Sequence, residues 1–211
     1  MHDTSPAPDK ASLRRTLRRR RMALTAAERR RAALAVARHA RRFIGRGRRL
    51  GAYLACGSEL DLEPLMSEAL FRGARLFLPV IPARGRRLWF SALGAQDRWY
   101  LHPRYRIPEY DGPRRRAERL DVLFVPLLGV DASGYRMGQG GGFYDATLAY
   151  LARRRHFRKP LLVGVAYDCQ RVSVLPREPW DIRLDYLVTE SGCWRFGRPL
   201  PAVAPVSAPI A

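Results

Sequence analysis

The sequence has few of the residues that build disulfide frameworks or structural zinc sites. Its three cysteines, Cys56, Cys169 and Cys193, are far apart and form no C-x-x-C pair, whereas zinc sites and disulfide scaffolds use closely spaced or numerous cysteines. The histidines show no metal-ligand spacing either: His2, His39, His102 and His156. We therefore expect reduced, partly buried cysteines and assign the histidines no role.

Long apolar runs are also missing. No stretch approaches the roughly 18 apolar residues of a membrane-spanning helix, and the basic N-terminal region lacks the apolar core of a signal peptide. We expect a cytoplasmic protein with no membrane partner. With 211 residues the chain can bury one sizeable core, which favours a single α/β domain.

Lysine is nearly absent, although the formal net charge is +20. Only Lys10 and Lys159 are lysines among the 39 basic residues, and residues 1–49 carry a net +13, which leaves +7 for the other 162 residues. A strongly basic balance favours polyanionic partners. The arginine bias is nevertheless also explained by genomic composition, so we consider nucleic acid an unlikely partner and expect attraction of small polyanions.

The sequence pattern divides the chain into a central domain and two terminal segments. Residues 1–9 are rich in proline and polar residues and are expected to be disordered, and residues 199–211 form a flexible Pro/Ala-rich tail. The domain therefore spans residues 10–198. Apolar spacing predicts helices over residues 10–22, 25–44 and 62–71, the second starting with a capping box at Thr25 and Glu28.

Short apolar runs predict strands over residues 50–55, 75–80, 88–90, 122–125, 161–166 and 186–188. The runs VLFVP and LLVGVAY do not alternate, as expected for parallel strands covered on both faces. The predicted fold is a three-layer α/β domain with a mostly parallel central sheet and helices on both faces. Residues 98–118, rich in Pro, Arg and Tyr, are predicted to form a long surface loop.

The most informative segment is residues 120–150, where an apolar strand leads through a glycine-rich loop into a helix. Four glycines let the backbone approach a ligand closely: Gly138, Gly140, Gly141 and Gly142. A helix opening near Gly142 or Phe143 would point free N–H groups at an anion, Arg136 suits phosphate oxygens, and Asp145 offers an oxygen ligand for Mg²⁺. The loop matches neither the Walker loop nor the dinucleotide fingerprint.

The pattern R-x-G-x-G-G-G-F-Y-D over residues 136–145, preceded by a VP…G…D…G strand exit, resembles the signature of the 5-formyltetrahydrofolate cyclo-ligase family, also called 5,10-methenyltetrahydrofolate synthetase. Three further segments match in the expected order, at residues 10–14, 53–59 and 180–189. The resemblance covers roughly residues 10–190.

This resemblance implies an enzyme that uses ATP and Mg²⁺ to cyclise 5-formyltetrahydrofolate, with or without a polyglutamate tail, to 5,10-methenyltetrahydrofolate, with release of ADP and phosphate. It implies a catalytic role for Arg136. The implied ATP contacts are Lys10, Arg14, Arg136, Met137, Gly138, Gln139, Gly140, Gly141, Gly142, Phe143 and Tyr144. The implied substrate contacts are Leu54, Glu59, Gln139, Gly140, Gly141, Gly142 and Phe143, and the implied metal ligands are Asp145 and Asp181.

Without the resemblance, several of these residues have simpler roles. Lys10 and Arg14 lie four apart on one helix face and can reach one polyphosphate, or they are solvent-facing charges; Arg15 and residues 18–21 are interpreted as surface charge. Asp145 can complement a helix dipole, while Asp61 can cap a helix. Asp181 and Asp185 can make turns. One of the aromatic pair Phe143 and Tyr144 is expected to pack against the sheet and the other to line the folate site.

Three other functions stay open at this point. One is a phosphosugar isomerase or CoA-transferase-like enzyme on a related fold, because fold does not fix function. Another is an RNA-binding protein that uses the arginine-rich N-terminal helices, although no RNP-type or KH motif is present. The third is a divergent paralogue with another substrate, since the family commonly has Tyr-Tyr where Phe143 and Tyr144 stand, and a basic or aromatic residue at Gln139.

Overall fold

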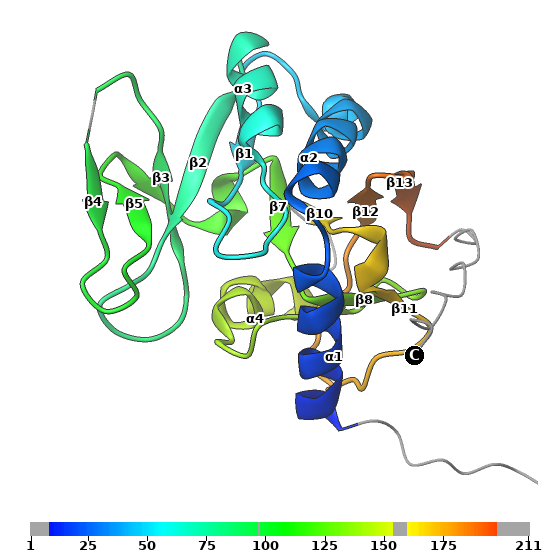
Figure 1. Cartoon of the computed structure of the whole chain (residues 1–211). Coiled ribbons are helices and arrows are strands. Elements are labelled where there is room, and N and C mark those ends of the chain that lie inside the picture. Colours follow the sequence, from blue (N-terminus) through cyan, green and yellow to red (C-terminus); the bar gives the residue numbers. More distant parts are fainter. Residues whose placement is uncertain (1–8, 97, 154–159, 198–211) are drawn as a thin grey trace, which may run out of the picture.

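A computed structural model describes residues 9–96, 98–153 and 160–197 (Figure 1). Its main sheet consists of β1 (Arg49–Gly51), β2 (Arg75–Val80), β3 (Trp89–Ala92), β6 (Arg114–Arg115), β7 (Val122–Pro126), β10 (Leu161–Val165), β12 (Tyr186–Thr189) and β13 (Gly192–Arg195). The strand order is β13-β12-β10-β7-β1-β2-β3-β6. The five strands from β12 to β2 are parallel, and β13, β3 and β6 pair antiparallel at the two edges.

The helices are α1 (Lys10–Met22), α2 (Ala26–Ala40), α3 (Glu63–Phe71) and α4 (Phe143–Leu148), with 3₁₀ turns η1 (Arg41–Phe43), η2 (Ala117–Arg119), η3 (Ala149–Arg153) and η4 (Asp168–Gln170). Alternate residues of the central strands face opposite layers. Val122 and Phe124 of β7 join the core beneath α2 and α3, whereas Leu123 and Val125 join the core that contains Leu148 of α4. The predicted mostly parallel sheet with helices on both faces is therefore confirmed.

Helix α1 packs on a small second sheet and not on the main one. This sheet has the order β11-β8-β9, with β8 (Gly129–Asp131), β9 (Arg136–Met137) and β11 (Arg171–Val172). Leu17 of α1 is fully buried with Leu128, Met137 and Leu175. Leu13 packs against the same cluster, so the apolar stripe predicted for this helix faces the strand that opens the glycine loop.

Several element boundaries differ from the prediction. The capping box of Thr25 and Glu28 is present, but α2 ends at Ala40 and a 3₁₀ turn carries the chain to Phe43. The first strand ends at Gly51, not at residue 55, because the chain leaves the sheet at its carboxyl end and turns toward the cleft described below. Asp9, expected in a disordered segment, caps α1 by accepting a hydrogen bond from Ser12 N at 3.2 Å.

The prediction of a surface loop over residues 98–118 is wrong. The segment holds β6, η2 and a two-stranded arm of β4 (Trp99–Leu101) and β5 (Pro108–Tyr110), which projects beside the main sheet in Figure 1. Glu109 and Tyr110 are buried, and Trp99 packs edge-on against Tyr110 with ring centroids 5.2 Å apart. Strands of two or three residues are too short to show alternation, which is why the pattern looked like a loop.

The remaining expectations about the chain ends and the membrane are treated separately. Residues 1–8 and 198–211, for which a disordered start and a flexible tail are predicted, lie outside the described residues. Within the described ranges, no helix is long and apolar enough to cross a membrane.

Candidate active site

A cavity of about 480 Å³ opens at the carboxyl ends of the parallel strands β1, β2 and β7. Ligands of α/β proteins gather at this edge of the sheet. Much of the lining comes from the glycine loop over residues 136–145, the segment after β1 and the β4–β5 arm, and further lining residues come from α1, the end of β7 and the β2–β3 connection. The predicted residues among its lining are Arg14, Leu54, Glu59, Arg136, Gly138, Gln139, Gly140, Gly141, Gly142, Phe143, Tyr144 and Asp145.

The glycine loop has the backbone conformation that its sequence requires. Gly140 has a φ of 106° and Gly142, the N-cap of α4, has a φ of 69°, values that residues with a Cβ rarely adopt. Among the described residues no side chain caps α4, so its first N–H groups can donate to another acceptor. The helix begins at Phe143 as predicted, and the loop can present backbone donors to a phosphate group.

Helix α1 supplies cations to this loop. Arg14 Nε donates to the carbonyl of Gly138 at 3.2 Å, and Arg18 Nη2 donates to Gln139 Oε1 at 3.0 Å. The interpretation of Arg18 as plain surface charge is therefore wrong, because its position one helical turn after Arg14 places it on the same face. Two guanidinium groups lie against the loop where an anion would bind.

The guanidinium group of Arg136 is held in place by other groups of the protein. Its side chain is 4% exposed and forms an ion pair with Asp145, with 2.6 Å between Nη2 and Oδ1, while Nη1 donates to the carbonyl of Ile182 at 2.8 Å. Burial lowers the pKa of Arg136, and the charges of Asp145 and then Asp181 oppose that change. The buried Arg136 is therefore paired with a carboxylate whose side chain is 50% exposed at the cavity.

Glu59 faces the loop from the segment after β1. Its Oε2 accepts a hydrogen bond from Cys56 N at 3.1 Å, and its Oε1 accepts a long one of 3.4 Å from Gln139 Nε2. Gln139 therefore connects Arg18 on one side with Glu59 on the other. The predicted ATP-binding loop and the predicted folate-binding carboxylate lie in one cleft.

Both aromatic residues that open α4 line the cavity and pack against the core. Phe143 contacts Tyr105 of the arm edge-on, with ring centroids 5.8 Å apart. The hydroxyl of Tyr144 is buried and has no hydrogen-bond partner in the described part of the chain. Burial and then the charge of Glu59 raise the pKa of Tyr144 above its ordinary value, which favours the protonated hydroxyl.

Three predicted site residues do not line this cavity in the described part of the chain. Lys10 forms an ion pair with Glu178, at 2.6 Å, and the side chain of Met137 is buried beneath α1. Asp181 lines a separate cavity, and its Oδ2 accepts a hydrogen bond from Glu178 N at 2.8 Å, which is the turn role considered for it. No group of three or more His, Cys, Asp or Glu side chains that could hold a metal is found among the described residues.

Sequence reasoning missed the contribution of the arm and of the β2–β3 connection. Tyr105, Ile107 and the buried Glu109 line the cavity. Glu109 ties the arm to the sheet, since it accepts hydrogen bonds from Ile81 N at 2.8 Å and from Tyr100 Oη at 2.6 Å. The many Tyr, Pro and Arg residues in the segment 98–118 were a signal for a contribution to the site, but the same composition also favours a loop.

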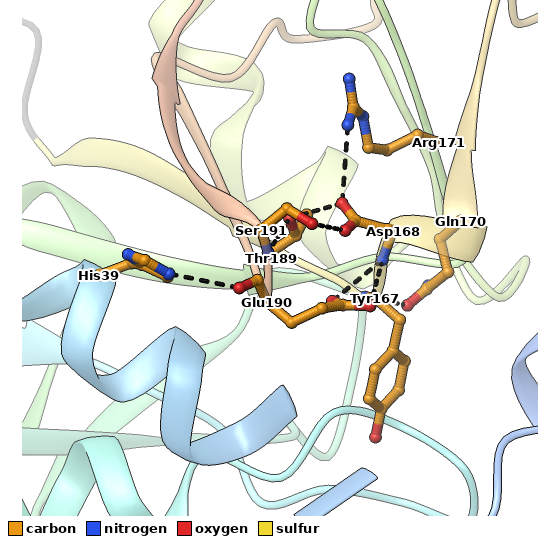
Figure 2. A network of polar contacts seen from close by, with 8 residues as sticks. All are labelled: His39, Tyr167, Asp168, Gln170, Arg171, Thr189, Glu190 and Ser191. Carbon is orange, nitrogen blue, oxygen red and sulfur yellow. Dashed lines mark hydrogen bonds and ion pairs between the residues drawn. The ribbon is translucent and has the colours of Figure 1, made fainter. Parts of the chain in front are cut away.

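A polar network fixes the ends of β10 and β12 beside the cleft (Figure 2). Asp168 accepts hydrogen bonds from Thr189 Oγ1 at 2.6 Å and from Ser191 Oγ, and its backbone N–H donates to both carboxylate oxygens of Glu190 at 3.1 Å. Gln170 Oε1 accepts from Tyr167 N at 2.8 Å. The network orients Tyr167, whose hydroxyl reaches the carbonyl of Glu59 at 3.5 Å.

Fold and cleft together define an α/β protein whose glycine-rich loop and Glu59 meet in one cavity at the carboxyl ends of the parallel strands. A sequence model of the 5-formyltetrahydrofolate cyclo-ligase family matches residues 6–190. The chain belongs to this family, which confirms the resemblance.

Individual relatives agree with this assignment. The 5-formyltetrahydrofolate cyclo-ligase of Escherichia coli K12 is 38% identical over 151 residues, which cover 70% of this chain and 80% of the relative. The structure of Aquifex aeolicus 5,10-methenyltetrahydrofolate synthetase superposes with a TM-score of 0.73 at 32% identity, covering 92% of this chain and 96% of that one. The synthetase of Mycoplasma pneumoniae, at 21% identity and a TM-score of 0.68 over 87% of this chain and 99% of that one, shares the fold.

Family membership makes the chain a ligase-type enzyme of folate one-carbon metabolism. The rival interpretations, a phosphosugar isomerase or CoA-transferase, an RNA-binding protein and a paralogue with another substrate, are not favoured.

Proposed function

We propose that this protein catalyses the ATP-dependent cyclisation of 5-formyltetrahydrofolate to 5,10-methenyltetrahydrofolate, with release of ADP and phosphate. One observation carries the proposal: the glycine loop and Glu59 face each other across one cavity of about 480 Å³ and are connected by Gln139. The reaction needs a phosphate site and a folate site in contact, because the γ-phosphoryl group must reach the formyl oxygen.

The chemistry divides into two balanced steps. The formyl oxygen attacks the γ-phosphorus and ADP leaves, which converts a poor leaving group into a phosphate ester. N10 then attacks the formyl carbon and releases its proton to solvent, and the C–O bond breaks so that the ring closes and inorganic phosphate departs. Phosphoryl transfer depends mostly on positioning and on neutralising charge, so cations and backbone donors suffice and no protein nucleophile is required.

Each half of the cleft has residues suited to one substrate. The loop amides, with Arg14 and Arg18 beside them, would bind the phosphate chain, and Arg136 would add its positive field from behind the loop. A carboxylate can accept two N–H bonds from a pterin edge, which is the role proposed for Glu59. Leu54 and Phe143 would supply apolar contact, and Tyr144 a hydroxyl donor.

We also propose that Mg²⁺ accompanies ATP. Magnesium takes one or two protein carboxylates and completes its octahedron with water and phosphate oxygens, so Asp145 and Asp181 form a sufficient donor set. Asp145 is half-exposed at the cleft. The charges of both carboxylates raise the pKa of Arg136, against the effect of burial. Bound there, the ion would neutralise phosphate charge during the transfer. A cytoplasmic location and acceptance of polyglutamylated folate remain predictions.

The proposal is tested by following the near-ultraviolet absorbance of the methenyl product from 5-formyltetrahydrofolate. We expect product only when both ATP and Mg²⁺ are present, with ADP formed in equal amount. If no product forms in the complete mixture, as in the mixture without ATP, the proposed function is rejected.

A further inference from the structure

Arg21 is a buried cation in a helix whose other arginines are mostly exposed. It belongs to the basic run interpreted as surface charge, yet only 3% of its surface is exposed. Its Nε donates to Ser58 Oγ at 3.0 Å, whereas its buried Nη1 has no hydrogen-bond partner among the residues that the structure describes. A buried guanidinium with an unused donor is costly for the fold, so its presence calls for a functional explanation.

Arg21 lies beside residues 57–60, which we call the Glu59 turn. Burial lowers the pKa of Arg21, and the charge of Glu59 is the largest influence that opposes this change. Tyr53 and Tyr167 flank the same turn: Tyr53 Oη donates to the carbonyl of Leu60 at 3.0 Å, and Tyr167 Oη to that of Glu59 at 3.5 Å. The guanidinium therefore lies behind the segment that carries the carboxylate.

Arg21 also completes a stripe of arginines along α1. Arg14, Arg18 and Arg21 are spaced four and three residues apart, which places them on one helix face. They donate in turn to Gly138, Gln139 and Ser58. One rigid element thus contacts first the glycine loop and then the Glu59 turn.

We propose that Arg21 is a positioning residue for the folate substrate. Through Ser58 it fixes the Glu59 turn, and so the direction in which the Glu59 carboxylate meets the pterin ring. The inference rests on the proposed function, because it assigns Glu59 to folate. It adds that α1 positions both halves of the cleft, the loop through Arg14 and Arg18 and the Glu59 turn through Arg21.

The test uses the full-length protein and compares Arg21→Gln, Arg21→Lys and Ser58→Ala with the matched control Arg19→Gln, which removes an exposed arginine of the same helix. KM for 5-formyltetrahydrofolate and KM for ATP are measured by product absorbance, and folate binding without ATP by calorimetry. For Arg21→Gln we expect KM for folate to rise roughly ten- to a hundredfold, as for loss of a charge-assisted contact, with KM for ATP nearly unchanged. Arg21→Lys should recover much of the loss, and Ser58→Ala should show a smaller change in the same direction.

A double-mutant cycle separates positioning from general damage. If Arg21 acts through Glu59, then Arg21→Gln should add little to Glu59→Gln, because the two changes disturb the same interaction. Equal changes in both KM values, full additivity with Glu59→Gln, or kinetics like those of Arg19→Gln would overturn the proposal. Should Arg21→Gln fail to fold, Arg21→Lys and Ser58→Ala decide by the same criteria.

Measurements on the wild-type protein distinguish failure of the positioning role of Arg21 from failure of the proposed function. Wild-type turnover with an unaffected folate KM in the Arg21 variants rejects only the positioning role. A wild-type protein that neither turns over nor binds 5-formyltetrahydrofolate rejects the proposed function, and the role of Arg21 with it.

Discussion

At the scale of single residues, Cys56 can serve as a chemical probe of the part of the cleft near Glu59, where we propose that folate binds. The residue lines the cavity and is exposed as a whole, but its thiol is partly buried. This partial burial, and to a smaller extent the charge of Glu59, raises the pKa of the thiol above its ordinary value of 9.0. Since the thiolate is the reactive form, alkylation by iodoacetamide at pH 8 should be slower than for a free cysteine. The rate should keep rising with pH beyond 9.

The labelling is followed by mass spectrometry, with Cys56→Ser as control. Glu59→Gln should accelerate it at pH 8, because removing the negative charge lowers the thiol pKa. Bound 5-formyltetrahydrofolate should protect the thiol. A rate that levels off below pH 8, or no protection by folate, would contradict the arrangement of Cys56 beside a folate site.

Asp145 and Asp181 are tested as metal ligands by titration. Loss of a ligand raises the Mg²⁺ concentration needed for half-maximal turnover, whereas loss of a helix-cap or turn carboxylate costs about 0.5–2 kcal/mol of stability without changing metal dependence. We expect Asp145→Asn and Asp181→Asn each to raise the half-saturating Mg²⁺. The double variant should be no worse than the poorer single one if both act on one ion.

Asp61→Asn is the matched control, since Asp61 accepts a hydrogen bond from Glu63 N at 2.9 Å at the start of α3. Its Mg²⁺ dependence should equal that of the wild type. A lower melting temperature with normal Mg²⁺ dependence in the Asp181 variant would leave that residue with its observed turn role at Glu178.

At the scale of elements, the glycine loop owes its shape to only some of its glycines. Gly142 has a φ of 69°, and a Cβ there would lie 3.2 Å from Arg86 Nη1. Gly138 has open space around a built Cβ and no positive φ. Gly142→Ala should cost about 1–2 kcal/mol, or a fall in melting temperature of roughly 2–8 °C for a chain of this size.

Gly138→Ala is the matched control and should not lower the melting temperature; we expect a rise of roughly 1–4 °C, because Ala is compatible with its backbone conformation and restricts the unfolded chain. Thermal unfolding of both variants without ligand decides the matter. Equal losses in the two variants would mean that the loop conformation does not depend on the left-handed residue at its end.

The elements that depend on local signals could be predicted from the sequence. The helix at residues 10–22, the capping box of Thr25 and the start of α4 follow from spacing, caps and glycines, and they are confirmed. The short arm strands were missed because they are defined by pairing with each other and by the burial of Tyr110.

The site was predictable to the same extent. The loop, Glu59 and Leu54 follow from motif residues, and they do share one cleft. The burial of Arg21 and the contact of Arg18 with Gln139 depend on which distant surface α1 packs against. No pattern within a single helix contains that information.

At the scale of the whole molecule, the basic charge has two parts with different effects. Arg14 and Arg18 contact the loop, whereas Arg15 and Arg19 are exposed on the same helix. Reversing Arg15 and Arg19 to Glu should leave turnover nearly unchanged and weaken any electrostatic retention on nucleic acid. Replacing Arg14 and Arg18 with Ala should instead raise KM for ATP, measured at fixed salt because exposed charges are screened over about 8–10 Å. Loss of turnover in the reversed variant alone would refute this division.

The contact between α1 and the second half of the chain also affects how the protein is made. Lys10 pairs with Glu178, 168 positions away, and Leu17 is buried against Leu175. Ribosomes release the N-terminal part first, so the apolar stripe of α1 emerges long before its binding surface. Until synthesis reaches the later segment, the nascent chain must keep Leu13 and Leu17 from aggregating. The docking of α1 therefore has to wait for the segment around Leu175, and chaperones have their longest opportunity to act before it.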